Sequence, residues 1–348
     1  MNDTMHIGGT LIGADAPPFI IAEMSGNHNH SIEKAFEIID RAATCGAHAI
    51  KLQTYTADTI TVRNAYTITD KKSLWYGREL YDLYDEAHTP WKWHKQLFDL
   101  AKQKNILCFS SPFDETAVDF LESLDCPAYK IASFENFHYP LLRKVARTGK
   151  PIIMSTGVST LDQITESVKQ LRDHGCKELA LLKCTSSYPA PEADANVLTV
   201  PDLAKRFHCV SGLSDHTMGI GVSVAAVAHG AAIIEKHFTI SRAEGGPDSA
   251  FSLEPTELEA LVTESKRAYL SLGKVSYDVQ VAEEKNLMFK PSIYAAADIK
   301  AGEALTVQNL KVRRPFKGIS PTEWDKALTK KAKQPIFKDS PITWDLLQ

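Results

Sequence analysis

The 348-residue sequence predicts a closed barrel of eight parallel β-strands that alternate with helices, followed by a small second domain. Three observations support this fold class. Short β-branched runs alternate with longer helical segments, as in repeated βα units. Nearly every run ends on a polar or ionisable residue, which is where barrel enzymes place their chemistry. Beyond Gly273 the pattern changes to short segments and turns.

The predicted strands are eight β-branched runs, and eight parallel strands favour a closed barrel over an open sheet. In chain order they are Phe19–Glu23, His48–Gln53, Ile106–Ser110, Ala128–Ile131, Pro151–Ser155, Leu179–Lys183, Cys209–Leu213 and Ala232–His237. Helical patterns lie between most of these runs. In SIEKAFEIIDRAATCG, Ser31 is placed to cap a helix and Gly46 to end it.

The connection after the second strand is unusually long, running from Thr54 to Lys104. It contains the aromatic-rich segment SLWYGRELYDLYDEAHTPWKWH. Loops of this length are uncommon unless they are functional. Part of the segment should also pack on the barrel as an amphipathic insertion.

The chain is expected to divide into three parts. Residues 1–272 form the barrel, residues 273–290 form a polar linker, and residues 291–348 form a compact domain of short strands and turns. The last part is too short to be another barrel.

Composition excludes several function classes. The net charge of −4 gives no reason to expect a nucleic-acid partner, which would need clustered basic surface. No apolar run approaches the roughly 18–20 residues of a membrane span. The six cysteines are scattered without a Cys-x-x-Cys pair, which favours reduced thiols in a cytoplasmic protein.

The polar residues at the strand ends would meet on one rim of the barrel. They include lysines, histidines, carboxylates and hydroxyls: Glu23, Lys51, Gln53, Ser110, Ser111, Lys130, Ser133, Ser155, Thr156, Lys183, Thr185, Ser186, Tyr188, Ser214, Asp215, His216, Glu235, Lys236 and His237. A lone serine after a strand is more often a helix cap, and a lone lysine more often reaches to water. Eight strands ending this way indicate an active site.

The mixture of residue types indicates the chemistry of that rim. Lysines with hydroxyls suit a phosphate or carboxylate ligand. His216 and His237 end adjacent strands, so their imidazoles could converge on a divalent metal such as manganese, iron, cobalt or zinc. Asp215 or Glu23 would then orient a water molecule or move its proton. The sequence GGPD, which ends at Asp248, reads either as a plain turn or as a loop that presents Asp248 to a substrate.

Several motifs together resemble the sialic acid synthase family, in order and spacing, over almost the whole chain. They are IIAEMSGNHNHS, AIKLQTY, CFSSPFD, AYKIASFE, PIIMSTG, KCTSSYP, GLSDHT, EKHFT, GGPDSAFSLEP and, near the C-terminus, VRRP. The resemblance implies a (β/α)8 TIM barrel followed by an SAF domain similar to type III antifreeze proteins. Within the family, the aromatic-rich segment and KCTSSYP resemble the pseudaminic acid synthase branch, because N-acetylneuraminate synthases typically have Asn at the position of Ser186.

The resemblance also implies roles for individual residues. His216 and His237 would bind the metal and Glu23 would be the acid/base carboxylate. Phosphoenolpyruvate would be held by seven residues: Lys51, Ser110, Lys130, Ser133, Ser155, Lys183 and Ser214. Gln53, Tyr188 and Asp248 would contact the sugar. Arg314, in VRRP, would reach into the barrel of a partner subunit, which implies a domain-swapped homodimer.

The implied activity is a condensation of phosphoenolpyruvate with an amino-sugar aldehyde. The metal would be manganese, with magnesium or cobalt as alternatives, and the sugar 2,4-diacetamido-2,4,6-trideoxy-L-altrose. N-acetylneuraminic or legionaminic acid synthesis would be the same reaction on another sugar. The sequence also leaves two other classes of function possible. One is a Schiff-base aldolase that uses the Lys183 amine, and the other is a sugar-binding or structural protein without activity.

Overall fold

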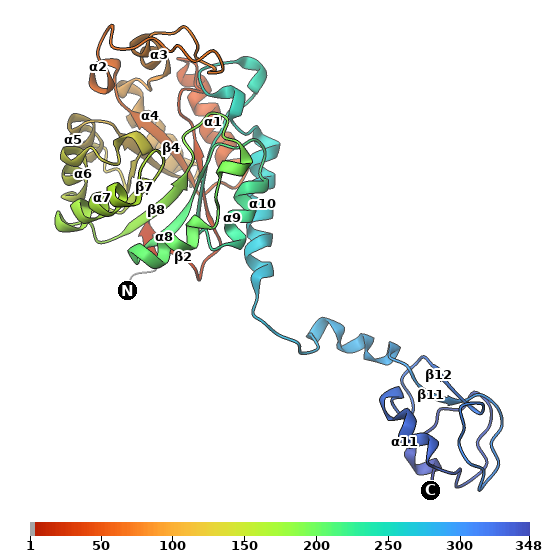
Figure 1. Cartoon of the computed structure of the whole chain (residues 1–348). Helices are drawn as coiled ribbons and strands as arrows, with labels where there is room; N and C mark the ends of the chain where they lie inside the picture. The colour runs from red at the N-terminus through yellow and green to blue at the C-terminus, as the bar shows by residue number, and fades with distance from the viewer. Residues whose placement is uncertain (1–3) are drawn as a thin grey trace. The chain divides into compact units, whose positions relative to one another are not determined.

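The computed structural model describes residues 4–348 of the chain and divides it into two compact units. The first unit is Met1–Gly273 and the second is Lys274–Gln348. Each has its own hydrophobic core. The first unit is drawn from red to cyan-green in Figure 1 and contains all the polar strand ends described above.

A closed barrel of eight parallel strands forms the centre of the first unit, as predicted. The strands are β3 (Phe19–Glu23), β4 (Ala49–Thr54), β5 (Leu107–Pro112), β6 (Tyr129–Ile131), β7 (Ile152–Ser155), β8 (Leu179–Cys184), β9 (Val210–Asp215) and β10 (Ile233–His237). They are neighbours in chain order, and β10 pairs with β3 to close the ring. Each predicted run coincides with one of these strands to within three residues.

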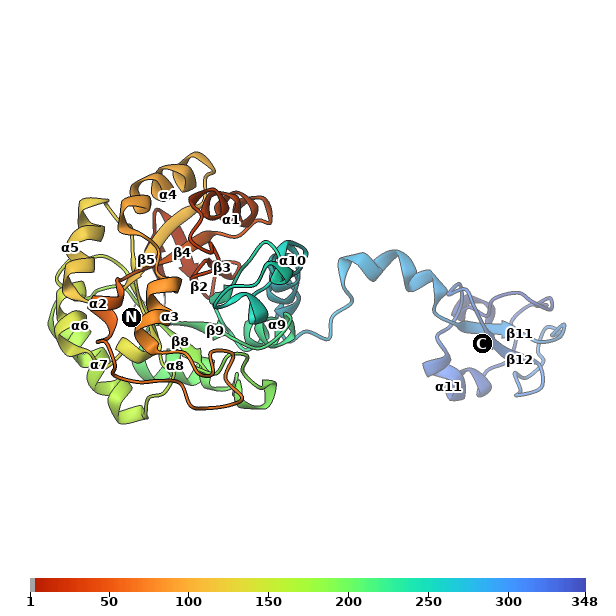
Figure 2. The same ribbon diagram turned by 90° about the horizontal axis from the view of Figure 1, so that it is seen from above.

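Within residues 4–273, ten α-helices accompany the strands, and most surround the barrel as an outer layer (Figure 2). They are α1 (Ile32–Thr44), α2 (Ala57–Ile60), α3 (Leu80–Ala87), α4 (Trp91–Gln103), α5 (Glu115–Ser123), α6 (Tyr139–Ala146), α7 (Leu161–Asp173), α8 (Thr199–Phe207), α9 (Gly221–Ala228) and α10 (Pro255–Leu272). Short 3-10 helices are η1 (Ser133–Glu135), η2 (Glu192–Asp194), η3 (Arg242–Glu244) and η4 (Ser249–Phe251).

Helix α1 shows how the sequence sets these elements. The Ser31 hydroxyl caps it by accepting a hydrogen bond from the backbone N–H of Lys34, which confirms the predicted N-cap. Gly46 follows the helix with a φ of 85°, a left-handed conformation that favours glycine. Between these ends, Ile38 and Ile39 are fully buried against the strands.

An antiparallel hairpin, β1 (Thr4–Ile7) and β2 (Thr10–Gly13), precedes the barrel and was not predicted from the sequence. Met5, Ile7 and Ile12 are fully buried in the same core as residues of the barrel strands. The backbone N–H of His6 bonds to Glu178, just before β8, and Gly8 lies directly against Leu107 at the start of β5. The hairpin therefore closes the N-terminal end of the barrel.

The long connection after β4 has two parts. Helix α4 is a regular member of the outer layer and packs on β5. Before it, residues 55–90 form an insertion that contains α2, α3 and a looped segment. The loop is closed by backbone bonds from Ile68 to Arg78 and from Gly77 to Ile68, and by a bridge between Thr67 and Glu79.

The second unit is built around a small apolar core that includes Ile293, Leu310 and Ile342. Its elements are η5 (Val281–Phe289), β11 (Ser292–Ala295), β12 (Leu310–Arg313), η6 (Pro321–Glu323), α11 (Trp324–Leu328) and η7 (Trp344–Leu346). Strands β11 and β12 pair antiparallel. Within residues 4–348, no helix is long and apolar enough to cross a membrane.

Candidate active site

Most predicted site residues converge at the C-terminal end of the barrel. Because side chains alternate along a strand, only every second residue can face the interior. The inward set comprises Glu23, Lys51, Gln53, Ser111, Lys130, Ser155, Cys184, Ser214 and Glu235, as their mutual contacts show. His216 and His237 lie beside this set at the ends of β9 and β10.

Two lysines and two glutamates form a buried charge cluster in the barrel. Lys51 Nζ lies 2.7 Å from Glu23 Oε2 and 3.6 Å from Glu235 Oε2. Lys130 Nζ lies 3.3 Å from Glu235 Oε1 and donates a hydrogen bond to Ser155 Oγ at 2.8 Å. All four charged side chains are at most 6% exposed. Burying charges is costly unless they are paired, so these groups depend on one another.

Glu235 is the residue that connects the two lysines. Burial alone would raise the pKa of its carboxyl, but Lys130, Lys51 and the Ser214 hydroxyl hold that pKa at about 2. Ser214 Oγ donates to Glu235 Oε1 at 2.9 Å. Glu235 is therefore ionised at neutral pH and keeps both ammonium groups on the same side of the barrel.

Glu23 has a different environment although it contacts the same lysine. Its Oε1 accepts hydrogen bonds from Gln53 Nε2 at 2.9 Å and from the backbone N–H of Ser25 at 3.1 Å. Burial raises the pKa of Glu23, with Glu235 adding to the effect and Lys51 opposing it. Two neighbouring carboxyls whose pKa values are displaced in opposite directions are typical of acid–base sites.

Small polar groups surround the backbone of Gly157, two residues after the Ser155 hydroxyl that accepts a hydrogen bond from Lys130. The backbone N–H of Gly157 donates to Ser133 Oγ at 3.2 Å. A Cβ added at Gly157 would lie 2.3 Å from Ser186 Oγ and 2.7 Å from Ser133 Oγ. Glycine is thus required for the backbone to approach both hydroxyls. Hydroxyls and a lysine around a closely approaching backbone suit an anionic oxygen ligand.

His216 and His237 lie next to each other at the C-terminal end of the barrel, in an edge-to-face arrangement with ring centroids 5.4 Å apart. His216 Nδ1 lies 3.0 Å from the carbonyl oxygen of Thr185, which orients the ring. His237 Nδ1 is buried without a hydrogen-bond partner, and burial together with His216 lowers the pKa of His237 well below its ordinary value. A neutral, unpartnered imidazole beside a second imidazole fits a divalent metal.

Few other possible metal ligands lie near His216 and His237. Among residues 4–348 no group of three or more His, Cys, Asp or Glu side chains is arranged to hold a metal ion. Asp248 comes near, with Oδ2 3.9 Å from His237 Nδ1, and this carboxylate accepts a hydrogen bond from Ser25. Two protein ligands would leave coordination positions for water or substrate, which is the arrangement of a catalytic metal rather than a structural one.

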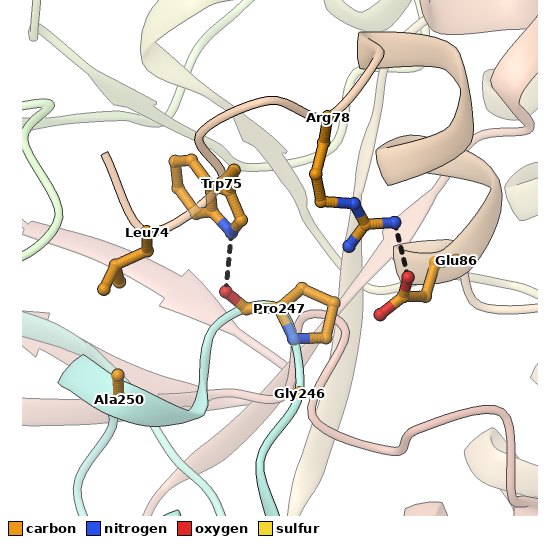
Figure 3. Close-up of a pocket in the computed structure, with 7 residues that line it drawn as sticks. All are labelled: Leu74, Trp75, Arg78, Glu86, Gly246, Pro247 and Ala250. Atoms are coloured by element: carbon orange, nitrogen blue, oxygen red, sulfur yellow. Dashed lines mark hydrogen bonds and ion pairs between the residues drawn. The ribbon is translucent and has the colours of Figure 1, made fainter. Parts of the chain in front are cut away.

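Aromatic side chains cover the histidine pair. The Tyr188 ring centroid is 4.4 Å from that of His216 and 5.2 Å from that of Phe251. Trp75, from the insertion, lies 5.7 Å from Tyr188 and donates its indole N–H to the carbonyl oxygen of Pro247 at 2.8 Å. The insertion thus reaches the loop after β10 (Figure 3).

Comparison with known proteins places this geometry in a family. The NeuB family model matches residues 38–277, and the SAF domain model matches residues 290–348. The chain belongs to the NeuB family. The resemblance to sialic acid synthases found in the sequence is confirmed, as is the combination of an eight-stranded barrel with an SAF domain.

Relatives within the NeuB family are named synthases. Pseudaminic acid synthase from Campylobacter jejuni is 41% identical over 333 residues, which cover 95% of this chain and 96% of the relative. N,N'-diacetyllegionaminic acid synthase from the same species is 36% identical, covering 93% of this chain and 98% of the relative. The crystal structure of N-acetylneuraminic acid synthetase from Leptospira borgpetersenii, in complex with citrate, aligns with a TM-score of 0.74 at 34% identity, covering 82% and 95% of the two chains.

In this NeuB-family barrel, two side chains assigned to phosphoenolpyruvate from the sequence do not point to the charge cluster. Ser110 points outward, where its hydroxyl pairs with Thr54 Oγ1 at 2.6 Å, and the adjacent Ser111 instead accepts a hydrogen bond from Lys51. Lys183 also points away from the charge cluster. Its Nζ bonds to the Cys184 carbonyl oxygen and to Thr185 Oγ1.

Cys184 takes the inward position that the sequence assigned to Lys183. Its sulfur lies 3.9 Å from His216 Nδ1. The Schiff-base alternative loses its nucleophile, because the Lys183 amine does not face the site, and membership of a synthase family also speaks against it. Because the NeuB family consists of synthases, the alternative of a structural protein without activity is also wrong.

Asp215 is also turned away from the histidines. Its carboxylate accepts from Lys236 Nζ at 2.9 Å and from Ser223 Oγ at 2.6 Å, in a buried network between the barrel and α9. Of the two carboxylates considered as acid–base groups, only Glu23 faces the barrel interior. Arg314 lies exposed in the second unit, beside a cis Arg314–Pro315 peptide bond.

Sequence reasoning did not assign roles to three residues that the structure brings to the NeuB site. Glu235 was noted only as a strand-end residue. Glu135 has a buried Oε2 without a hydrogen-bond partner, and burial raises the pKa of its carboxyl to about 7. Trp75 and its hydrogen-bond partner Pro247 are 172 residues apart in the sequence, so no local sequence pattern predicts their contact.

Proposed function

We propose that this chain condenses phosphoenolpyruvate with 2,4-diacetamido-2,4,6-trideoxy-L-altrose and water, releasing pseudaminic acid and phosphate. This proposal rests mainly on one observation: the two buried lysines, Lys51 and Lys130, lie at the same end of the barrel as His216 and His237. An anion site beside a divalent-metal site suits a doubly charged phosphate ester and an aldehyde. The 41% identity to a pseudaminic acid synthase supports the choice of sugar.

The anionic substrate would be held by Lys51 and Lys130 together with the hydroxyls of Ser111, Ser133 and Ser155. The two lysines are already balanced by Glu23 and Glu235, so the incoming negative charge needs compensation. A proton on Glu23, whose pKa burial raises, would supply part of it. Ser214 acts indirectly in this scheme, because its hydroxyl orients Glu235.

His216 and His237 would hold the divalent ion, and manganese is our first candidate. When bound, such an ion polarises a carbonyl oxygen as a Lewis acid. His216 is oriented for this task by the Thr185 carbonyl group, and His237 is kept neutral by burial. Tyr188 and Phe251 exclude water from one side of the pair.

In the proposed reaction, C3 of phosphoenolpyruvate forms a bond to the aldehyde carbon, and the new alkoxide takes up a proton. Water adds to C2, and the C2–O bond to phosphate then breaks to leave the 2-keto acid. Glu23, held by Gln53 and the Ser25 N–H, is placed to give and take these protons. Lys51 and Lys130 stabilise the departing phosphate.

Recognition of the sugar is assigned to Gln53, Tyr188 and Asp248. Arg314 would complete the site from the SAF domain of a second subunit, in a domain-swapped homodimer. This assignment follows the family resemblance of VRRP. We place the reaction in the cytoplasm, where the free thiols of Cys45, Cys108, Cys126, Cys176 and Cys184 would stay reduced.

The test is to offer the protein each candidate amino sugar with phosphoenolpyruvate and manganese, and to identify products by mass. We expect the L-altrose derivative to give pseudaminic acid with release of phosphate. Phosphoenolpyruvate labelled with ¹⁸O in its bridging oxygen should deliver the label to phosphate. Retention of the label in the sugar acid would refute C–O cleavage.

Legionaminic acid synthesis is the second candidate, because a legionaminic acid synthase is 36% identical over almost the whole chain. The chemistry would be the same, and only the stereochemistry of the diacetamido sugar would differ. The same panel of sugars decides between them by the ratio of kcat/KM values.

A further inference from the structure

The geometry points to a subsite for a neutral acylamino group of the sugar, built by Trp75 and Arg78 of the insertion and Pro247 of the loop after β10. This inference deepens the proposed function and rests on it, because an amino sugar must be the substrate. The subsite is a pocket of about 270 Å³ lined by Leu74, Trp75, Arg78, Glu86, Gly246, Pro247 and Ala250 (Figure 3).

The pocket adjoins the reacting centre without being part of it. Trp75 stands between the pocket and Tyr188, whose ring contacts His216. Pro247, on the other wall, directly precedes Asp248, whose carboxylate lies 3.9 Å from His237 Nδ1. If the aldehyde end of a sugar meets the histidine pair, a substituent near its other end is the group within reach of the pocket.

The lining of the pocket matches an acylamino group. Leu74, Trp75, Pro247 and Ala250 offer apolar surface for a methyl group. Arg78 supplies guanidinium N–H donors for a carbonyl oxygen, and within residues 4–348 only its Nη2 is engaged, by Glu86 Oε2 at 2.5 Å. Because Arg78 and Glu86 neutralise each other, the pocket has no spare positive charge for a carboxylate or phosphate.

The walls of the pocket are fixed before any ligand binds. Backbone bonds join Ile68 to Arg78 and Gly77 to Ile68, at 2.9 and 2.8 Å. On the opposite wall, Asn29 Nδ2 donates to the Gly245 carbonyl oxygen at 3.0 Å. The bond from the Trp75 indole to Pro247 then connects the two walls. Such preorganisation lowers the entropic cost of holding a ligand group.

The volume of the pocket also limits what it accepts. Pockets that take a whole small-molecule ligand usually have roughly 300–1,000 Å³. About 270 Å³ is therefore suited to one substituent of a larger ligand that is held elsewhere. The second acetamido group, which distinguishes a diacetamido sugar from a monoacetamido sugar, is the substituent we assign to it.

The experiment compares two sugars: the diacetamido aldehyde, and the same aldehyde with a hydroxyl in place of the acetamido group at C4. Steady-state kcat and KM are measured for wild type, Arg78→Met and Trp75→Phe. Arg63→Met is the matched control, since Arg63 lies on the same insertion but stacks on Tyr81 instead of lining the pocket. Arg78→Lys tests whether a charge without the planar donor group is enough.

We expect Arg78→Met to raise KM for the diacetamido sugar roughly tenfold or more, as loss of a charge-assisted hydrogen bond does. KM for phosphoenolpyruvate should stay unchanged, and the preference for the diacetamido sugar over the hydroxyl analogue should fall by a similar factor. Trp75→Phe should lower the preference less, and Arg63→Met should leave it unchanged.

The outcomes separate the inference from the proposed function. Equal losses with both sugars in Arg78→Met would overturn the subsite, because a defect in folding or chemistry affects both sugars alike. An unchanged preference in that variant would overturn it too. If wild type makes no product from any diacetamido sugar, the proposed function fails, and the subsite fails with it.

Discussion

Lys51 Nζ lies 2.7 Å from Glu23 Oε2, and both side chains are at most 5% exposed. The pair holds one lysine between two glutamates, since Glu235 is also near. Lys51→Met should lower kcat/KM by at least about 100-fold and cost about 3–5 kcal/mol of stability, because uncompensated carboxylates stay buried. Chemical denaturation and steady-state kinetics measure both effects.

Two further variants control this prediction. Adding Glu23→Gln to Lys51→Met should recover part of the stability but none of the activity. Lys95→Met removes an exposed helical ion pair with Asp99 and should change stability by less than about 0.5 kcal/mol. Full stability in Lys51→Met would show that the cluster does not act as a unit.

The metal assignment predicts that His216→Ala and His237→Ala each reduce turnover by at least about 1,000-fold. Excess EDTA should do the same to wild type, and added manganese should restore activity. His229→Ala, an exposed histidine after α9, serves as control and should behave as wild type. Full activity in excess chelator would exclude a metal from the reaction.

Gly157 allows the backbone to approach Ser133 and Ser186. Gly157→Ala should raise KM for phosphoenolpyruvate by roughly 100-fold, since the added Cβ would displace both hydroxyls. Gly221→Ala is the matched control, because a Cβ at Gly221 meets open space. Titration calorimetry with phosphoenolpyruvate would measure the effect independently of turnover. Equal affinity of the two variants for phosphoenolpyruvate would contradict a binding role for the Ser133 and Ser186 hydroxyls at Gly157.

The raised pKa of Glu135 predicts that the KM for phosphoenolpyruvate depends on pH. Burial raises the pKa of its carboxyl from 4.5 to about 7, so the group is neutral in slightly acidic solution and charged above pH 7. The charged form competes with substrate anions for Lys130. The KM of wild type for phosphoenolpyruvate should therefore rise as pH increases through about 7. In Glu135→Gln this rise should disappear.

The same shift affects stability. Because the folded-state pKa is the higher one, the folded protein binds the proton more tightly than the unfolded chain. The stability contributed by protonated Glu135 is thus fully present below about pH 4.5 and is lost as pH rises towards about 7. Stability curves of wild type and Glu135→Gln that run parallel over this range would contradict the shift.

The domain-swapped dimer can be tested by complementation between two inactive full-length chains. Neither Arg314→Ala nor His237→Ala should be active alone. If Arg314 works in the partner's barrel, mixed dimers contain one intact site, and an equal mixture should recover about a quarter of wild-type activity. Absence of recovery, with mixed dimers demonstrated by mass spectrometry, would show that Arg314 does not act across subunits.

The sequence was sufficient for the barrel because each strand is an apolar, β-branched run with a polar end. The β1–β2 hairpin was missed because each of its strands is only four residues long. Short runs of this kind do not differ visibly from ordinary N-terminal segments. Their burial depends on the barrel end that they cover, which no local pattern reveals.

Within the site, sequence reasoning found the strand ends but could not always tell the two faces of a strand apart. In a strand buried on both sides, neighbouring residues look alike, and a shift of one position changes the face. This is why Ser110 was chosen over Ser111, and Lys183 over Cys184. Glu235 and Trp75 act through partners far along the chain, so their roles required the fold.

The β1–β2 hairpin covers the N-terminal end of the barrel and closes that end to substrates. Under the proposed function, substrates and products would therefore pass through the opposite end, where Trp75 contacts Tyr188 and Pro247. A finished product would have to diffuse out through this end before the next pair of reactants can enter. If the insertion and the loop after β10 contact the sugar as proposed, a change in their sequence should alter the rate of product release together with selectivity.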